Sequence, residues 1–277
     1  MRIRMVALCA VAIFWPVAFA HASGQTYYLA LGDSLAVGAE PVSPMPGPNN
    51  VLQMTSEGYA NDIFAKLSQN NSSLQLKELG CIGETTGTMI QGGICDYGED
   101  GSQLHAAMDF LRNNQVSLIT LDIGANDIDS CISTSGINNT CVFGALVRVG
   151  GDLSFILGQL RRAASNVPII GMNYYDPFLG AWLLGPSGRT IAIQSLEATD
   201  LFNSVLDSVY DAFEIPVANV AGAFQINNFT PVPGQNVPLN VALTRKWTFV
   251  GYGITVANVH PNNDGYAVIA AAFEAKL

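Results

Sequence analysis

Apolar residues along this chain fall into two alternating patterns. Short apolar runs bounded by turn residues are typical of strands that are buried on both faces of a sheet. Runs of this kind occupy residues 27–31, 74–79, 116–123, 167–175 and 215–220, and the second of them alternates apolar with polar positions. The pattern therefore predicts five strands.

Between these runs, apolar residues recur at the three- and four-residue spacing of amphipathic helices. We expect helices over residues 59–69, 102–113, 142–164, 192–213 and 266–277. A regular alternation of strand and helix is typical of a parallel sheet that helices cover on both faces. The fold class predicted from this pattern is α/β.

Residues 221–256 break the alternation. Pro231, Pro233 and Pro238 fall in this stretch, and it shows no long helical pattern. Short extra strands over residues 248–250 and 254–256 are the elements we expect there. A loop of this length in a compact domain usually has a function.

The first residues have the layout of a secretory signal peptide. Arg2 and Arg4 precede an apolar run from residue 5 to residue 20, and a small-x-small pattern ends at Ala22. The run is too short for a membrane span and has the wrong flanks. We therefore expect residues 1–22 to be removed and residues 23–277 to form one exported domain, either extracellular or periplasmic. No later stretch is expected to span a membrane.

Composition narrows the class of partner. The whole chain has a formal net charge of -10, and loss of the two leader arginines makes it -12. So acidic a protein is not expected to bind nucleic acid or an anionic membrane surface. The sequence contains no cofactor motif, and we expect a monomer that acts on a small or lipid-like molecule.

Four cysteines remain after the leader, which indicates two disulfides in an exported protein. Three pairings are possible, and we favour the two local ones, Cys81–Cys95 and Cys131–Cys141. Loops of this size contribute roughly 3 kcal/mol each in the chain-entropy model. A zinc site is the alternative, but no close CxxC pair is present and the histidines lie far away, so no metal is expected.

Polar groups able to carry chemistry follow three predicted strands and precede the last helix. They are Ser34 after the first strand, Gly83 after the second, Asn126 after the third and His260 before the final helix. The carboxyl ends of parallel strands meet at one edge of a sheet, where open α/β sheets hold ligands. Acyl transfer needs a nucleophilic hydroxyl, a base and donors to an oxyanion, and these four residues supply them.

The sequence around these residues resembles the SGNH hydrolases, the family of GDSL esterases and lipases. Four blocks carry the resemblance, in the family's order and over nearly all of the chain after the leader. They are Gly32-Asp33-Ser34-Leu35, Gly80-Cys81-Ile82-Gly83-Glu84-Thr85-Thr86, Gly124-Ala125-Asn126-Asp127 and Val259-His260-Pro261.

The resemblance implies a fold and a chemistry. The fold is a flavodoxin-like three-layer α/β/α sandwich with a five-stranded parallel sheet in the order 2-1-3-4-5. The chemistry is hydrolysis of carboxylic esters through an acyl-enzyme on Ser34, with His260 as general base. The oxyanion would be bound by the backbone N–H groups of Ser34 and Gly83 and by the side chain of Asn126.

The last block departs from the family at one position. The family usually has an acid two residues before the histidine, and here that residue is Asn258. Asn258 can act as an uncharged third member of a triad, a backbone carbonyl near residues 256–259 can orient His260 instead, or the site is impaired. In the last case the protein would be a secreted binding protein on the same fold.

Substrate class is suggested by one apolar loop. Residues 178–184 lie after the fourth strand and contain Phe178, Trp182, Leu183 and Leu184. We expect these side chains to line an acyl pocket or a lid, and the alternative is that they cover the edge of the sheet. A carbohydrate deacetylase on the same fold is the remaining enzyme class.

Overall fold

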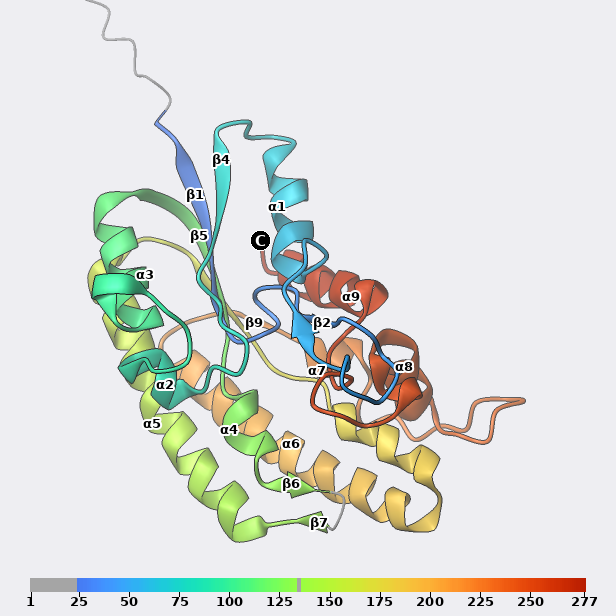
Figure 1. Cartoon of the computed structure of the whole chain (residues 1–277). Helices are drawn as coiled ribbons and strands as arrows, with labels where there is room; N and C mark the ends of the chain where they lie inside the picture. The colour runs from blue at the N-terminus through green and yellow to red at the C-terminus, as the bar shows by residue number, and fades with distance from the viewer. Residues whose placement is uncertain (1–23, 134–135) are drawn as a thin grey trace, which may run out of the picture.

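The computed structural model describes residues 24–133 and 136–277 (Figure 1). The expected signal peptide therefore lies outside the described residues. Within them the chain forms one layered α/β structure, with the sheet running through its centre and helices on either side.

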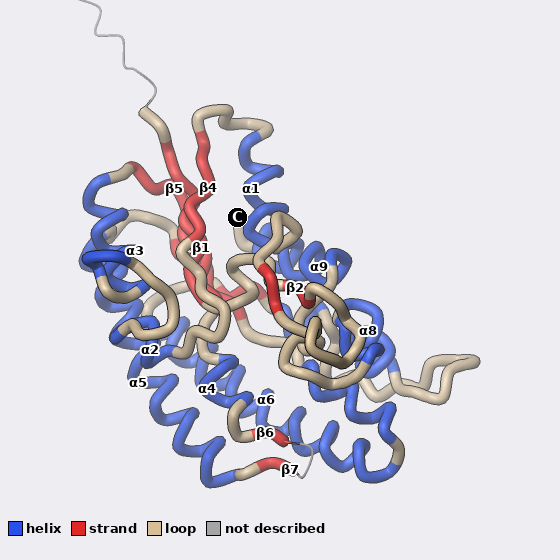
Figure 2. Tube along the Cα trace, viewed as in Figure 1, coloured by secondary structure: helices blue, strands red, loops and turns tan. Residues whose placement is uncertain are grey.

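Five parallel strands form the central sheet (Figure 2). Their order is β4-β1-β5-β8-β9, which confirms the predicted order 2-1-3-4-5. The strands are β1 (Thr26–Gly32), β4 (Leu74–Glu78), β5 (Gln115–Asp122), β8 (Ile169–Met172) and β9 (Val217–Ala218). The three inner strands, β1, β5 and β8, are largely buried because strands lie on both sides of each and helices cover both faces.

Helices cover the two faces of the sheet, as the periodicity predicts (Figure 1). On one face lie α1 (Tyr59–Ser68) and α9 (Asn263–Glu274), where Tyr59 stacks on Phe273 with ring centroids 4.7 Å apart. On the other face lie α3 (Gln103–Asn113), α5 (Asn139–Ala163) and α6 (Pro186–Ala212). The three-layer sandwich is thus confirmed.

One helix qualifies the expectation that nothing after the leader could span a membrane. By length and composition alone, α5 is long and apolar enough, with a mean hydropathy of 1.6 over its best window. Its buried side, which includes Leu153 and Leu157, packs in the domain core. A long core helix passes the same test as a membrane span, so the composition of α5 does not place it in a membrane.

The structure corrects our prediction for residues 221–256. They contain the short helix α7 (Val220–Ala223), the helix α8 (Leu239–Trp247) and a 3-10 segment η3 (Phe249–Tyr252), rather than two extra strands. The buried side of α8 includes the polar residues Asn240 and Thr244, which hide its periodicity in the sequence. Asn240 is accommodated because its amide donates to the carbonyl of Ile226 at 2.8 Å.

Several short elements surround the carboxyl end of the sheet and were not predicted. Two are helical, α2 (Thr86–Gln91) and α4 (Ala125–Asp129); α2 follows the turn that carries Gly83, and α4 contains Asn126 in its first turn. The others are the 3-10 segment η1 (Gly98–Asp100) and two hairpins, β2 (Glu40–Pro41) with β3 (Leu52–Gln53) and β6 (Ile132–Ser133) with β7 (Gly136–Ile137).

Both favoured disulfides are present. Cys81 is bonded to Cys95 and Cys131 to Cys141, across 14 and 10 residues of sequence respectively. The first bridge fixes the turn after β4, and the second closes the excursion between α4 and α5.

Candidate active site

The end of β1 positions the candidate nucleophile. Gly32 has a φ of 138°, and a Cβ at this position would lie 1.9 Å from the carbonyl oxygen of Asp122, so only glycine fits. The side chain of Gln103 holds both backbone groups of Gly32, accepting from its N–H at 2.7 Å and donating to its carbonyl at 2.9 Å. The backbone that leads into the turn carrying Ser34 is therefore held in place.

Asp33 holds the turn itself. Its carboxylate accepts from the N–H of Leu35 at 2.9 Å and from the hydroxyl of Tyr174 at 3.2 Å. Its own N–H donates to the backbone carbonyl of Asp122 at 3.0 Å. These bonds hold the residues on either side of Ser34, and we assign Asp33 a positioning role.

Ser34 and His260, which are 226 residues apart in sequence, are in direct contact. The Oγ of Ser34 lies 2.7 Å from Nε2 of His260, and both side chains are buried. Nδ1 of His260 lies 3.0 Å from the carbonyl oxygen of Ala257. A carbonyl can only accept, so in the neutral ring the hydrogen is on Nδ1 and Nε2 is left to accept the serine proton.

Two tyrosine hydroxyls connect the segments on either side of the candidate site. The hydroxyl of Tyr175, just after β8, donates to the carbonyl of Val259 at 2.8 Å. The hydroxyl of Tyr266, in α9, donates to the carbonyl of Ala39 at 2.8 Å, which joins this helix to the segment after Ser34. The sequence placed Tyr175 in the fourth strand and Tyr266 at the start of the last helix, and it predicted neither contact.

The side chain of Asn258 is hydrogen-bonded to groups other than His260 in this arrangement. Its Nδ2 donates to the carbonyls of Pro44 and Gly253, both at 2.9 Å, and its Oδ1 accepts from Asn50 at 2.8 Å. These bonds direct the buried amide away from the imidazole. The geometry corresponds to the second of the three alternatives, in which a backbone carbonyl contacts Nδ1.

Asn258→Asp is therefore expected to destabilise the protein rather than to restore a charged triad. A carboxylate has no hydrogen to donate to Pro44 and Gly253, so two buried carbonyls would face a buried negative charge. We expect a loss of about 3 kcal/mol in the free energy of unfolding, measured by urea denaturation.

The control for that substitution is Asn227→Asp, at an exposed asparagine whose amide donates to Asp200. It should change the free energy of unfolding by less than about 1 kcal/mol. An Asn258→Asp variant of wild-type stability and raised turnover would contradict the role described for Asn258.

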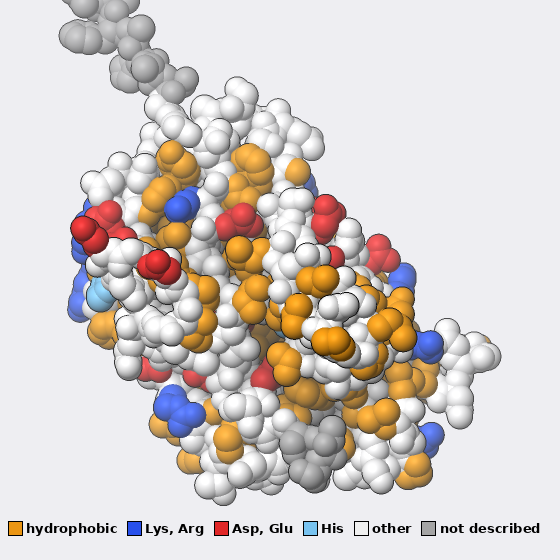
Figure 3. Space-filling model, in the orientation of Figure 1, with side chains coloured by type: hydrophobic (Ala, Val, Ile, Leu, Met, Phe, Trp, Pro, Cys, Tyr) orange, Lys and Arg blue, Asp and Glu red, His pale blue; other side chains and the backbone are white. Residues whose placement is uncertain are grey.

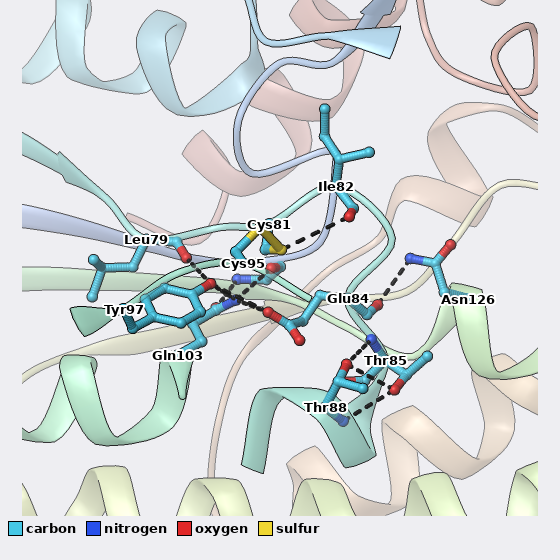
Figure 4. The surroundings of a disulfide bond; sticks show 11 residues. Leu79, Cys81, Ile82, Glu84, Thr85, Thr88, Cys95, Tyr97, Gln103 and Asn126 are labelled. Atoms are coloured by element: carbon cyan, nitrogen blue, oxygen red, sulfur yellow. Dashed lines mark hydrogen bonds between the residues drawn. A yellow bond between two sulfur atoms is a disulfide. The ribbon is translucent and has the colours of Figure 1, made fainter. Parts of the chain in front are cut away.

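Three hydrogen-bond donors of the candidate site residues have free capacity. Within the described parts of the chain, no partner is found for the backbone N–H of Ser34 or of Gly83. Asn126 uses one amide hydrogen, donating to the carbonyl of Glu84 at 2.8 Å, and its second hydrogen remains available (Figure 4). Gly83 and Asn126 both line the same cavity as His260.

The turn that carries Gly83 is held by a buried polar network (Figure 4). The carboxylate of Glu84 accepts from the hydroxyl of Tyr97 at 3.2 Å and from Nε2 of Gln103 at 3.1 Å. Because Gln103 also holds Gly32, this network connects the turn after β4 to the turn after β1. In the sequence, Gln103 is only a polar residue in the first turn of an amphipathic helix. Such a residue alone indicates a helix cap and no role in the site.

Carboxyl groups, and no Lys or Arg, are found among the residues that line the cavity. Burial raises the pKa of Asp33 to about 6, and burial with the charges of Asp33 and Asp176 raises that of Asp129 to about 7. Burial also raises the pKa of Asp122 well above its ordinary value, with Asp33 as the next cause. Burial lowers the pKa of His260 to about 4, against the effect of the carbonyls of Ala257 and Val256.

A cavity of about 690 Å³ is lined by His260 and by Asp33 and Leu35, the two chain neighbours of Ser34. Its walls are mostly apolar and come from the ends of β1, β5 and β8 together with the loop before α9. Two of the four predicted pocket residues, Phe178 and Leu184, line it. Trp182 and Leu183 are not among the lining residues, which corrects that part of the prediction.

The physical reason is the helix type of this segment. Residues Pro177–Leu184 form a 3-10 helix, η2, whose period of three places Phe178, Ala181 and Leu184 on the cavity side. Trp182 instead packs against Phe229, with ring centroids 6.0 Å apart. A 3-10 segment cannot be told from an irregular loop by apolar composition alone.

Among the residues that the structure describes, no group of three or more His, Cys, Asp or Glu side chains could hold a metal ion.

Comparison with known structures finds the same fold in secreted and microbial ester-cleaving enzymes. An extracellular lipase from Streptomyces rimosus is 15% identical over 91% of this chain and 100% of its own, with a TM-score of 0.60. A lipase from a goat rumen metagenome is 18% identical over 90% and 96% of the two chains, with a TM-score of 0.57. Phospholipase A1 from Streptomyces albidoflavus is 18% identical over 92% and 100%, with a TM-score of 0.54.

At these identities the structural likeness concerns the fold. No curated protein matches the chain in sequence. The model of the GDSL-like lipase/acylhydrolase family, in contrast, matches residues 30–268, which include Ser34, Gly83, Asn126 and His260. The chain therefore belongs to the GDSL-like lipase/acylhydrolase family and is a hydrolase that acts on esters.

Proposed function

We propose that the protein is an exported esterase or lipase that cleaves acyl esters through a Ser34–His260 dyad. The observation that carries the proposal is the 2.7 Å contact between Ser34 Oγ and His260 Nε2 at the wall of an apolar cavity. The two disulfides and the leader pattern support export, because such bridges persist in oxidising compartments.

The proposed reaction has two halves. Ser34 Oγ attacks the ester carbonyl carbon while its proton passes to Nε2 of His260, and the carbonyl π electrons become an oxyanion. Collapse of this intermediate breaks the bond to the leaving oxygen, which takes the proton from Nε2 as the alcohol departs. Water then repeats the sequence on the acyl-serine, which releases the carboxylic acid and restores the serine.

The oxyanion would be bound by the three donors with free capacity. They are the N–H groups of Ser34 and Gly83 and the second amide hydrogen of Asn126. Donors fixed in a site that excludes water stabilise developing charge strongly, because they need no reorganisation during the reaction.

In the proposed mechanism, the Ala257 carbonyl takes the place of the acid that usually accepts a hydrogen bond from the histidine ring. It orients the ring and fixes the tautomer through Nδ1, 3.0 Å away, but it carries no full charge to stabilise the imidazolium. The lowered pKa of His260 is consistent with this, since burial is its main cause and no carboxylate acts on it. The base is weak, and it stays neutral over a wide range of pH.

The pH dependence of kcat/KM for a soluble ester should reflect this. His260 must be neutral to accept the serine proton, and a pKa lowered to about 4 extends the neutral form to lower pH. The fall in activity caused by protonation of His260 should have its midpoint near pH 4, whereas an ordinary histidine would place that midpoint near 6.5.

Asp129 provides the control, because its pKa is raised to about 7 and it lines the same cavity. Asp129→Asn should remove any step near neutral pH and leave the step near pH 4. A single step near 6.5 that persists in this variant would contradict the lowered pKa of His260.

The acyl group is proposed to occupy the apolar cavity. Phe178 and Leu184 contribute from η2, and Ile128 and Phe202 from helices α4 and α6. Burial of each methylene favours binding by about 0.8 kcal/mol, so catalytic efficiency should rise with chain length until the cavity is filled.

The proposed function is tested with p-nitrophenyl esters from acetate to palmitate. We expect kcat/KM to rise from acetate to octanoate and Leu184→Ser to reduce that rise. Activity confined to acetate would favour a carbohydrate deacetylase, to be checked by release of acetate from acetylated xylan. No turnover of any ester would support a binding protein.

A further inference from the structure

Two segments beside the cavity lack charge altogether. Residues 41–56 and 248–259 contain no Asp, Glu, Lys, Arg or His. Six large apolar side chains of these segments are between 52 and 84% exposed. We call them the apolar rim, and they are Val42, Met45, Val51, Met54, Tyr252 and Val256.

The two segments form one surface although they are about two hundred residues apart. Thr255 Oγ1 donates to Asn50 at 2.5 Å, and Asn258 Nδ2 donates to the carbonyl of Pro44 at 2.9 Å. Within the first segment, the N–H of Val42 donates to the carbonyl of Val51 at 2.8 Å beside the β2–β3 pair. These hydrogen bonds hold together the two segments that carry the exposed side chains.

Figure 3 shows hydrophobic side chains gathered on this part of the surface, where Figure 1 draws β2 and the loops beside α8. The same surface continues into the cavity. Leu52 and Ile254, from the two segments, line the cavity together with Val256, which is itself a member of the apolar rim. On η2, Leu184 also lines the cavity and is 64% exposed.

We propose that the apolar rim docks the protein on an electrically neutral lipid surface, with the cavity opening toward it. This inference rests on the proposed function, because an acyl chain drawn from such a surface could enter the cavity without crossing water. The absence of any cation in the two segments, on a chain of net charge -10, disfavours an anionic surface. Exposed apolar side chains insert into the boundary of a neutral bilayer without needing that attraction.

Asn258 acquires a role in this arrangement. Its side chain connects Asn50 and Pro44 of the first segment to Gly253 of the second. It thereby joins the apolar rim to the loop that carries His260, at the position where the family usually has an acid.

The test uses the full chain with Ser34→Ala, so that lipid is not consumed, and flotation with phosphatidylcholine vesicles. The rim variant carries Met45→Ser, Val51→Ser and Met54→Ser in addition. The control carries Phe143→Ser, Val147→Ser and Phe155→Ser, three side chains of α5 that are 49 to 70% exposed and do not line the cavity.

We expect the rim variant to lower the partition coefficient at least tenfold and the control to change it less than twofold. Adding phosphatidylglycerol to the vesicles should weaken binding by the parent protein. With Ser34 restored, both triple variants should hydrolyse soluble p-nitrophenyl butyrate within twofold of wild type, which separates failed docking from failed catalysis.

Four results would overturn the proposal. The first is vesicle binding that the rim variant keeps, and the second is binding lost in the α5 control instead. The third is a wild-type dimer in light scattering that the rim variant dissociates, which would assign the surface to a second copy of the chain. If wild type cleaves the soluble ester but the Ser34→Ala protein does not bind vesicles, docking is wrong and the proposed function stands.

Discussion

Replacing His260 by alanine should lower kcat for a soluble ester by about 10⁴-fold. The imidazole contacts Ser34 Oγ and is the proposed base, and general base catalysis contributes up to about 10⁴ in rate. The measurement is the steady-state rate with p-nitrophenyl butyrate, together with a thermal unfolding curve to show that the variant folds.

His105 provides the matched control, because it is exposed on α3 and lies outside the cavity. His105→Ala should change kcat less than twofold. Near-wild-type turnover by His260→Ala would show that another group activates the serine, and the dyad would then have to be abandoned.

Asn126→Ala should lower kcat by about 100- to 1000-fold, equivalent to roughly 3 kcal/mol of transition-state stabilisation. The free amide hydrogen of Asn126 is one of three donors available to the oxyanion, and the loss should fall on kcat more than on KM. The other hydrogen donates to Glu84 at 2.8 Å, so a stability loss of about 1 kcal/mol is expected as well.

A second substitution separates these effects. Asn126→Asp keeps the size of the side chain but cannot donate, so it should lose as much kcat as the alanine variant. If either variant retains more than a tenth of wild-type kcat while folded, Asn126 does not bind the oxyanion.

The central sheet was predictable because its strands carry their signal locally. β1 and β5 are short apolar runs that end in glycine and polar turn residues, and burial on both faces makes such runs continuous. Ser34 and His260 were also found from sequence, since each lies in a motif of few residues. Their 2.7 Å contact needed the fold, because 226 residues separate them.

The parts that were missed depend on contacts between distant residues. Whether Asn258 faces His260 or Pro44 is decided by the path of residues 41–56, which no local pattern reveals. Gln103 looks like an ordinary helix residue until Gly32 is placed against it. α8 was hidden because two of its buried positions, Asn240 and Thr244, are polar.

These misses have a common cause. Local periodicity identifies apolar faces, whereas a buried polar side chain is explained only by its partner. The residues that hold the segments around Ser34 and His260 are all of that kind, namely Asp33, Gln103, Tyr175 and Asn258.

The central claim is that Ser34 is a nucleophile activated by His260. Its most direct test is covalent labelling with a p-nitrophenyl alkylphosphonate, followed by mass spectrometry of the digested protein. We predict one adduct per chain, on the peptide that contains Ser34, formed far more slowly in His260→Ala. An unlabelled Ser34, an adduct at another residue, or equal rates in the two proteins would contradict the claim.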